Sequence, residues 1–133
     1  MIRIRRIYEA AEAEDGARLL VDRLWPRGLR KSEGALLRWA RELAPSDLLR
    51  RRLHGGRIDR DTFRMEYWQE LEAAPWQETV ALAVRENVTL LTATRDVEQS
   101  HLQVLRDFLK QKLRTGGSIP DRRDGGEAKA GES

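Results

Sequence analysis

The chain of 133 residues has the length of one domain, and its formal net charge of +3 at pH 7 is far below that of a protein that coats nucleic acid. It contains no cysteine, which excludes disulfides, thiol nucleophiles and thiolate metal sites. No apolar run reaches the length that spans a membrane, and the N-terminal residues lack the apolar core of a signal peptide. We therefore expect a cytoplasmic protein with no membrane partner.

Two segments near the N-terminus have the pattern of β-strands. Ile2 and Ile4 alternate with arginines, and Tyr8 is a candidate to extend the alternation, which is typical of a strand with one buried face. Residues 19–21 form a short, continuously apolar run, as in a strand buried on both faces. The link between the two segments is too short for a helical crossover, so we expect these strands to be antiparallel if they pair.

The middle of the chain carries the apolar spacing and the capping residues of four helices. The first is capped by Ser32, has Leu36, Trp39, Ala40 and Leu43 on its apolar face, and is followed by Pro45; the second is a short helix that is capped by Ser46 and ends at His54. The third starts near Asp59 or Asp61 and has Phe63, Tyr67 and Leu71 on its inner face. The fourth has Pro75 in its first turn and Trp76, Val80, Ala83 and Val84 on one face.

The end of the folded part is predicted as a strand followed by a helix. Residues 88–93 have the composition of a buried strand, and Asp96 with Gln99 resembles the capping box of a last helix. The core face of that helix consists of Val97, Val104, Leu105, Phe108 and Leu109. The Gly-rich, polar residues 115–133 bury too little apolar surface to offset the entropy cost of ordering them. We expect a folded domain over 1–114 and a disordered C-terminal tail over 115–133.

A strand, several helices and a second strand in succession form a crossover, which usually joins parallel neighbours. The strands that end at Val21 and Ala93 should therefore lie side by side and parallel. The predicted fold class is α/β, a small single domain with a few-stranded, partly parallel sheet flanked by helices. Ligands bind beyond the carboxyl ends of parallel strands. Residues 22–23 and 94–96 should therefore meet in one crevice.

The strongest candidate site begins with the segment Asp22-Arg23-Leu24-Trp25-Pro26-Arg27-Gly28, where a buried strand meets an irregular loop. An arginine fork at Arg23 or Arg27 would hold an anion, and Asp22 would act as orienter or general base. We expect Trp25 to line the crevice. The alternative is a structural Asp–Arg pair that only holds the loop in place.

Residues after the last strand are the candidates for the other side of the crevice. Asp96 is best explained as a helix N-cap, but helix N-termini also attract anions, and Arg95 would then supply charge. His101 is a candidate general acid or base because of its position, although a packed, hydrogen-bonded histidine is the common case. No His-x-x-x-His spacing, serine elbow or Gly-rich phosphate loop is present, so the sequence predicts no metal and no cofactor.

Several of these motifs together resemble a known family. Residues 21–28, then Trp39, Ala44-Pro45-Ser46, Leu49-Arg50, Phe63 to Tyr67 with Glu70-Leu71, and Arg95-Asp96 with His101 are similar to the YeaO-like branch of the domain-of-unknown-function family 488. The resemblance covers about residues 1–113 and implies a small bacterial α/β protein of uncharacterised activity. It also brings His54 into the predicted site, because the YeaO-like pattern usually has a histidine near that place.

The chain departs from the wider family at its thiols. Many members have a cysteine late in the last core strand and a Cys-His-Arg run that opens the final helix. Here the corresponding residues are Leu91-Thr92-Ala93-Thr94 and Ser100-His101-Leu102, so the histidine is kept and the thiols are absent. The resemblance therefore supports no thiol-dependent or metal-thiolate chemistry in this chain.

The sequence thus predicts binding of, or catalysis on, a small anionic ligand that is nucleotide or nucleobase-like. Asp22 and His101 are the predicted catalytic residues, and the predicted ligand-binding residues are Arg23, Trp25, Arg27, His54, Tyr67, Arg95 and Asp96. The alternative is a nucleic-acid-binding accessory or regulatory protein that uses the basic cluster of Arg50, Arg51, Arg52, Arg57 and Arg60. A third interpretation makes the polar segment only a structural brace.

Overall fold

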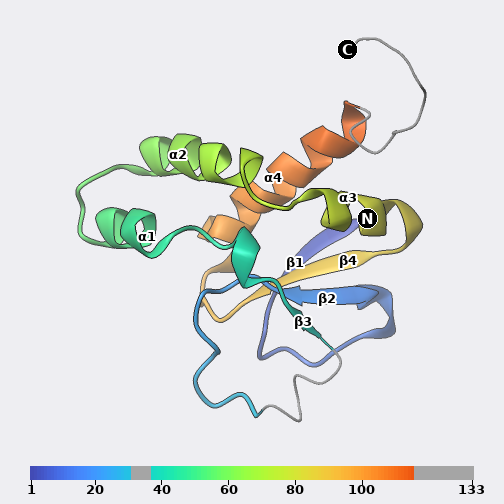
Figure 1. The fold of residues 1–133 in the computed structure, drawn as a ribbon. Coiled ribbons are helices and arrows are strands. Elements are labelled where there is room, and N and C mark those ends of the chain that lie inside the picture. Colours follow the sequence, from blue (N-terminus) through green and yellow to red (C-terminus); the bar gives the residue numbers. More distant parts are fainter. Residues whose placement is uncertain (31–36, 116–133) are drawn as a thin grey trace.

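The computed structural model describes residues 1–30 and 37–115. Its four strands are β1 (Ile2–Arg6), β2 (Ala17–Leu20), β3 (Arg38–Trp39) and β4 (Val88–Thr92), and its helices are α1 (Asp47–His54), α2 (Arg60–Glu72), α3 (Gln77–Arg85) and α4 (His101–Arg114). Short 3-10 helices cover Ala13–Asp15, Arg41–Leu43 and Val97–Gln99. The strands form one parallel sheet in the order β1-β4-β2-β3, with all four helices on one of its faces (Figure 1). The predicted α/β class is confirmed.

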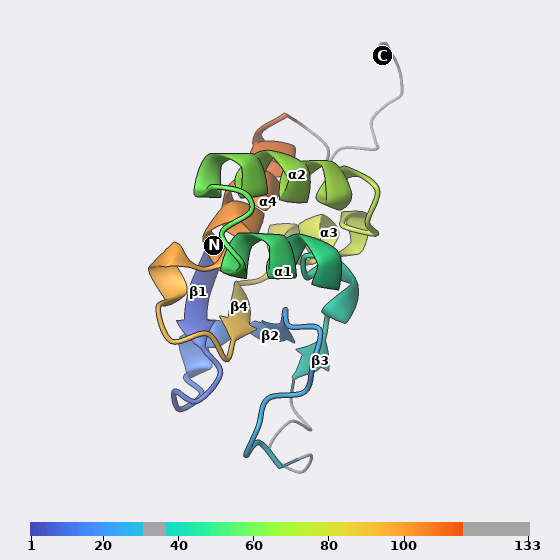
Figure 2. The same ribbon diagram turned by 90° about the vertical axis from the view of Figure 1, so that its left-hand side faces the viewer.

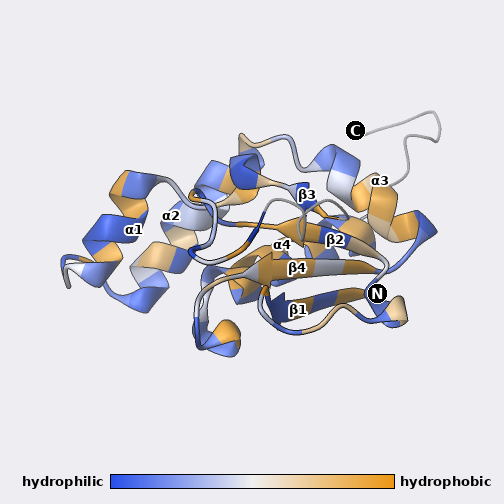
Figure 3. Ribbon diagram, turned by 90° about the horizontal axis from the view of Figure 1, so that it is seen from below, coloured by the Kyte–Doolittle hydropathy of each residue, from blue (hydrophilic) through white to orange (hydrophobic). Residues whose placement is uncertain are grey.

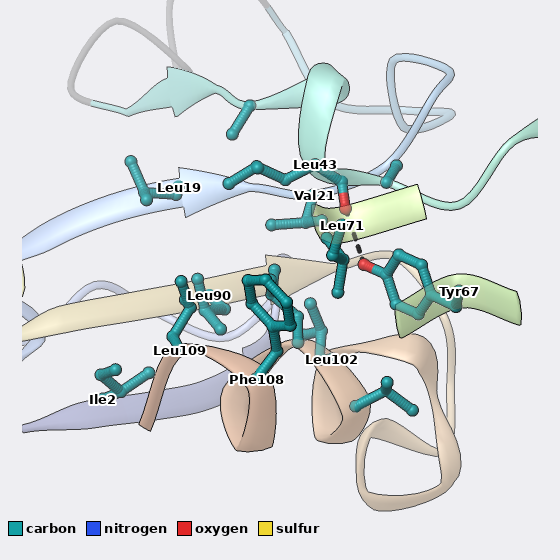
Figure 4. Packing of buried hydrophobic residues seen from close by; sticks show 14 of the residues in the cluster. Ile2, Leu19, Val21, Leu43, Tyr67, Leu71, Leu90, Leu102, Phe108 and Leu109 are labelled. Carbon is teal, nitrogen blue, oxygen red and sulfur yellow. Dashed lines mark hydrogen bonds between the residues drawn. The ribbon is translucent and has the colours of Figure 1, made fainter. Parts of the chain in front are cut away.

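The main core lies between the sheet and the helices. Leu90 in β4 is in register with Ile4 of β1 and Leu19 of β2, so one apolar row crosses the sheet. Helices α2 and α4 cover that row with buried side chains (Figure 4). Phe108 is fully buried and receives the edges of two tryptophan rings, Trp68 and Trp76. The packing of these side chains holds α2 and α4 against the sheet.

The opposite face of the sheet is covered by none of the four described α-helices and is partly charged. Figure 3, seen from this side, shows that β4 is mostly hydrophobic along its length and that β1 includes strongly hydrophilic residues. Asp15 is only 1% exposed and lies within 3.3 Å of guanidinium nitrogens of Arg3, Arg5 and Arg18. Burial raises the pKa of Asp15, but the Glu12 amide and the Arg5 guanidinium lower it more, so the net pKa is below the usual value. The ion cluster therefore covers a face that parallel sheets otherwise bury under helices.

Two strand predictions have different outcomes. The parallel pairing of β2 with β4 is confirmed. The antiparallel pairing expected for the first two strands, if they paired, does not arise, because β4 lies between β1 and β2 and is parallel to both. All five residues of β4 are buried, and the most apolar strand gains most from a central place in the sheet. The first strand ends at Arg6, and Tyr8 is exposed outside it.

The helix predicted to end before Pro45 is wrong within the described residues, and its cap Ser32 lies outside them. Trp39 belongs instead to β3, which pairs with the edge of β2. Leu37 and Trp39 pack on the helix-free face, whereas Ala40 and Leu43 belong to the main core. The apolar residues with helical spacing thus pack on two different faces of the sheet and do not form one face of a helix.

The other helices are close to their predicted positions. Ser46 caps α1, which ends at His54, and Asp59 caps α2. Helix α3 follows Pro75, although Val84 is largely exposed. The predicted capping by Asp96 is wrong, since its side chain makes no cap hydrogen bond and the amide of Leu102 donates to the Ser100 hydroxyl at the start of α4. Apart from Thr115, the predicted tail lies outside the described residues. No helix in the described ranges is both long and apolar enough to cross a membrane.

Candidate functional site

A cleft of about 1030 Å³ opens where β2 and β4 end. Its lining comes from the segment after β2, the loop after β4, the first turns of α4, and helices α1 and α2. Figure 2 shows α1 and α2 above this end of the sheet and the segment of residues 22–30 below it. The cleft is therefore at the carboxyl edge of parallel strands, where α/β proteins usually bind ligands.

Asp22 joins the two strand ends at the floor of the cleft. Its Oδ1 accepts a hydrogen bond of 2.7 Å from the Thr92 hydroxyl, and its Oδ2 accepts one of 2.8 Å from the Ala93 amide. The hydrogen bonds thus join the two strand ends through Thr92 and Ala93, just before the predicted residues 94–96, of which Thr94 and Asp96 line the cleft. The Asp22 backbone carbonyl accepts a further hydrogen bond, of 2.7 Å, from the Trp39 indole. The residue is held at three of its oxygen atoms.

His101 completes the surroundings of this carboxylate. Its Nε2 lies 3.5 Å from Asp22 Oδ1 and also contacts the Val21 carbonyl. A carbonyl can only accept, so Nε2 carries a hydrogen. Burial raises the pKa of Asp22, but the hydrogen bonds from His101, the Ala93 amide and the Thr92 hydroxyl lower it further, and the net pKa lies below the usual range. Asp22 is therefore an ionised carboxylate whose neighbours are all donors, which makes it a weak proton acceptor.

Tyr67 lies behind His101 and does not line the cleft. Its ring contacts the His101 ring edge-on, with 6.3 Å between centroids, and its hydroxyl donates to the Leu43 carbonyl at 2.6 Å. The side chain is fully buried, and this burial raises the pKa of the phenol well above its ordinary value. The hydroxyl stays a donor at every physiological pH. Tyr67 thus holds the wall that supports His101.

Arg23 fastens the start of α1 to the end of β2. Its Nε donates to the Pro45 carbonyl at 3.1 Å and its Nη2 to the Ala44 carbonyl at 3.0 Å. The next residue, Ser46, donates from its hydroxyl to Glu70 at 2.6 Å while capping α1. Arg23 lines the cleft, but its guanidinium is already engaged with two carbonyls.

A tight turn shapes the lower wall of the cleft. The Leu29 amide donates to the Pro26 carbonyl, and Gly28 has a φ of +84°, which is the sign that a type II turn requires at its third residue. The Trp25 indole donates to the Leu29 carbonyl at 2.7 Å, and the Tyr8 hydroxyl donates to the Arg27 carbonyl at 2.7 Å. These bonds fix the Trp-Pro-Arg-Gly segment against the sheet.

Basic side chains dominate the charged lining. The cleft is lined by five arginines, two histidines and three aspartates: Arg23, Arg27, Arg50, Arg60, Arg64, His54, His101, Asp22, Asp61 and Asp96. Arg64 pairs with Asp107 at 3.1 Å and Arg50 with Asp47 at 3.2 Å, but both pairs are about half exposed to solvent. Such pairs contribute little and exchange readily. These arginines therefore remain accessible to an anion.

Sequence reasoning placed some residues in the cleft and missed others. Tyr67 and Arg95, both predicted to bind ligand, do not line it, whereas the seven other predicted residues do. The sequence assigned Arg50 and Arg60 only to a basic cluster, and it overlooked Arg64. Arg60 and Arg64 are four residues apart on α2 and hence on one helix face, a spacing that the sequence shows. Across the described ranges, no group of three or more His, Asp or Glu residues could hold a metal ion.

Comparisons with known proteins agree with the resemblance. The model of a family described as "Inactive DUF488-N3 subclade" matches residues 1–125. The chain is 40% identical over 111 residues to "Uncharacterized protein YeaO" of Escherichia coli K12, which covers 82% of this chain and 96% of the relative. It is also 40% identical over 109 residues to "Uncharacterized protein Rv3073c" of Mycobacterium tuberculosis H37Rv, over 81% of this chain and 92% of the relative. No solved structure matches significantly.

Proposed function

The chain belongs to the inactive DUF488-N3 subclade, and we propose that it binds a small anionic ligand in the cleft without converting it. The observation that carries this proposal is the excess of arginines over aspartates in the lining of a large cleft at the carboxyl edge of the sheet. Guanidinium groups pair with carboxylate and phosphate oxygens through two parallel hydrogen bonds, which favours anions over neutral ligands.

The Asp22–His101 pair supports binding over catalysis. A general base needs a proton affinity near that of its surroundings at the working pH, whereas donors from Thr92, Ala93 and His101 stabilise the charged form of Asp22 and lower its pKa. We propose that Asp22 positions His101 and joins the strand ends, in place of the proton transfer that the sequence suggested. The word "inactive" in the family description agrees with this role.

Binding is tested by calorimetry with inorganic phosphate, ribose 5-phosphate and mononucleotides. The double variant Arg60→Gln/Arg64→Gln should weaken anion binding at least about tenfold. Gln99 engages the Nη1 of Arg60 through its carbonyl and its side-chain oxygen, and the other guanidinium donors of Arg60 would hold a charged oxygen. Arg64 would do so by exchanging its half-exposed pair with Asp107. The matched control Arg51→Gln/Arg85→Gln removes the same charge at residues outside the cleft lining and should stay within about twofold. Equal losses in both variants would mean that net charge, and not the cleft, governs binding. Chromatography of the ligand after incubation should recover it unchanged, and a product would contradict the absence of conversion.

Nucleic-acid binding is the second candidate, because Arg51 and Arg57 are exposed beside the cleft residues Arg50 and Arg60. A chain of phosphates would contact all four, whereas a small ligand would not reach the outer two. This candidate predicts a steep fall of affinity for DNA or RNA with salt. It also predicts that Arg51→Gln/Arg57→Gln reduces the salt slope. Oligonucleotide binding that neither falls with salt nor changes in that variant would refute it.

A further inference from the structure

Trp25 has the attributes of a fixed aromatic platform. It lines the cleft and also packs on the small apolar cluster of Ile7, Leu20 and Leu91. Its N–H is used internally by the Leu29 carbonyl, so the ring offers the cleft an apolar surface. Trp39 supports it edge-on, with 5.3 Å between ring centroids and an interplanar angle of 68°. A ring held in this way loses little rotamer freedom when a ligand binds.

The two sides of the cleft therefore differ in chemistry. The segment below the sheet end contributes three apolar side chains, Leu24, Trp25 and Pro26, to the lining, beside Arg23 and Arg27. Helices α1 and α2, which lie above it (Figure 2), contribute guanidinium groups to the lining, among them those of Arg60 and Arg64. A bare inorganic anion would use only the guanidinium groups and not the apolar side chains. A ligand that uses both walls needs a flat apolar ring and an anionic group in one molecule.

We propose, on the premise that the cleft binds an anion, that its ligand is a mononucleotide whose base contacts Trp25 and whose phosphate pairs with arginines of α2. Stacking on an aromatic side chain tolerates every base, because each base has a π-face. Nucleotide binding of this kind is selective for the ring-bearing anion over a sugar phosphate. Trp25 is then the residue that determines specificity, and the arginines supply the charge.

The experiment compares two ligands on the same protein sample. Calorimetry of the full chain should give an affinity for AMP at least about tenfold above that for ribose 5-phosphate, within the range that one stacked base contributes. Trp25→Leu should remove this preference and leave ribose 5-phosphate binding within about twofold, whereas Trp25→Phe should keep most of it. Trp76→Phe, at a tryptophan outside the cleft lining, is the control and should not change the preference. The ratio of two affinities within one variant does not depend on how much of the sample is folded.

The outcomes separate this inference from the proposed function. Equal affinities of the unaltered protein for AMP and ribose 5-phosphate would overturn the role of Trp25 but leave anion binding intact. Equal losses of affinity for AMP and ribose 5-phosphate in Trp25→Leu would also overturn the role of Trp25 and leave anion binding intact. If neither ligand nor inorganic phosphate binds, the proposed function is wrong and this inference with it.

Discussion

Replacing Asp22 by asparagine tests whether this carboxylate braces the cleft. The substitution keeps the shape of the side chain but removes its charge and turns one oxygen into an N–H donor. The Ala93 amide can only donate, so the remaining oxygen must face it. The new N–H groups then point toward the Thr92 hydroxyl and the His101 Nε2–H, where the carboxylate had accepted.

The expected cost follows from these contacts. A hydrogen bond to a charged group contributes about 1.5–3 kcal/mol, and the Thr92 hydroxyl can rotate to recover part of the loss. We expect Asp22→Asn to lower the free energy of unfolding by about 2 kcal/mol, which corresponds to a fall in Tm of roughly 8 °C for a domain of this size. Asp96→Asn is the matched control, because Asp96 is exposed and its side chain makes no hydrogen bond within the described ranges. Its cost should stay within about 0.5 kcal/mol.

The pH dependence of the difference gives a second, independent readout. The pKa of Asp22 is lower in the folded protein than its ordinary value. Its contribution to stability is therefore complete above the unfolded pKa of about 3.9 and is lost as the pH falls through the folded pKa. Urea unfolding gives the free energy of unfolding of the unaltered protein and of Asp22→Asn. The difference between the two free energies should be constant above about pH 5 and should become smaller below about pH 4. The bracing role would be refuted if Asp22→Asn lost no more stability than Asp96→Asn, or if the loss did not change with pH.

The glycine before β2 should accept no side chain: a Cβ at Gly16, where φ is +62°, would lie 2.1 Å from the Asn87 carbonyl oxygen. Gly16→Ala should lower the free energy of unfolding by at least about 2 kcal/mol. Gly56→Ala is the control, because Gly56 has a φ of +73° but open space around it, and it should cost only about 1 kcal/mol. Similar losses of Tm in the two variants would contradict this reasoning. Tyr67→Phe leaves the Leu43 carbonyl without its 2.6 Å hydrogen bond and should cost about 2 kcal/mol in urea unfolding while anion affinity stays unchanged, because Tyr67 lies outside the cleft lining. A loss of affinity without a loss of stability would assign Tyr67 to ligand binding instead.

Local signals in the sequence predicted the elements whose ends depend on nearby residues. Ser46 and Asp59 each accept a hydrogen bond from a backbone amide three residues later, so both helix starts are determined within one turn. The start of α4 was misplaced because Asp96 and Ser100 are both good caps, and only packing selects between them. The strand at Trp39 was missed for a similar reason, since its apolar neighbours fit a helix period equally well.

The meeting of residues 22–23 with residues 94–96 followed from connectivity, because a helical crossover places parallel strands side by side. The sequence alone could therefore locate the crevice and most of its charged residues. It could not show that the Thr92 hydroxyl and the Ala93 amide would each donate to one oxygen of Asp22, since these partners lie some 70 residues away along the chain. Nor could it place Trp25 and the arginines of α2 on different walls. Capping and periodicity act over a few residues, whereas the order of the strands and the lining of the cleft arise only when distant segments bury their apolar surface together.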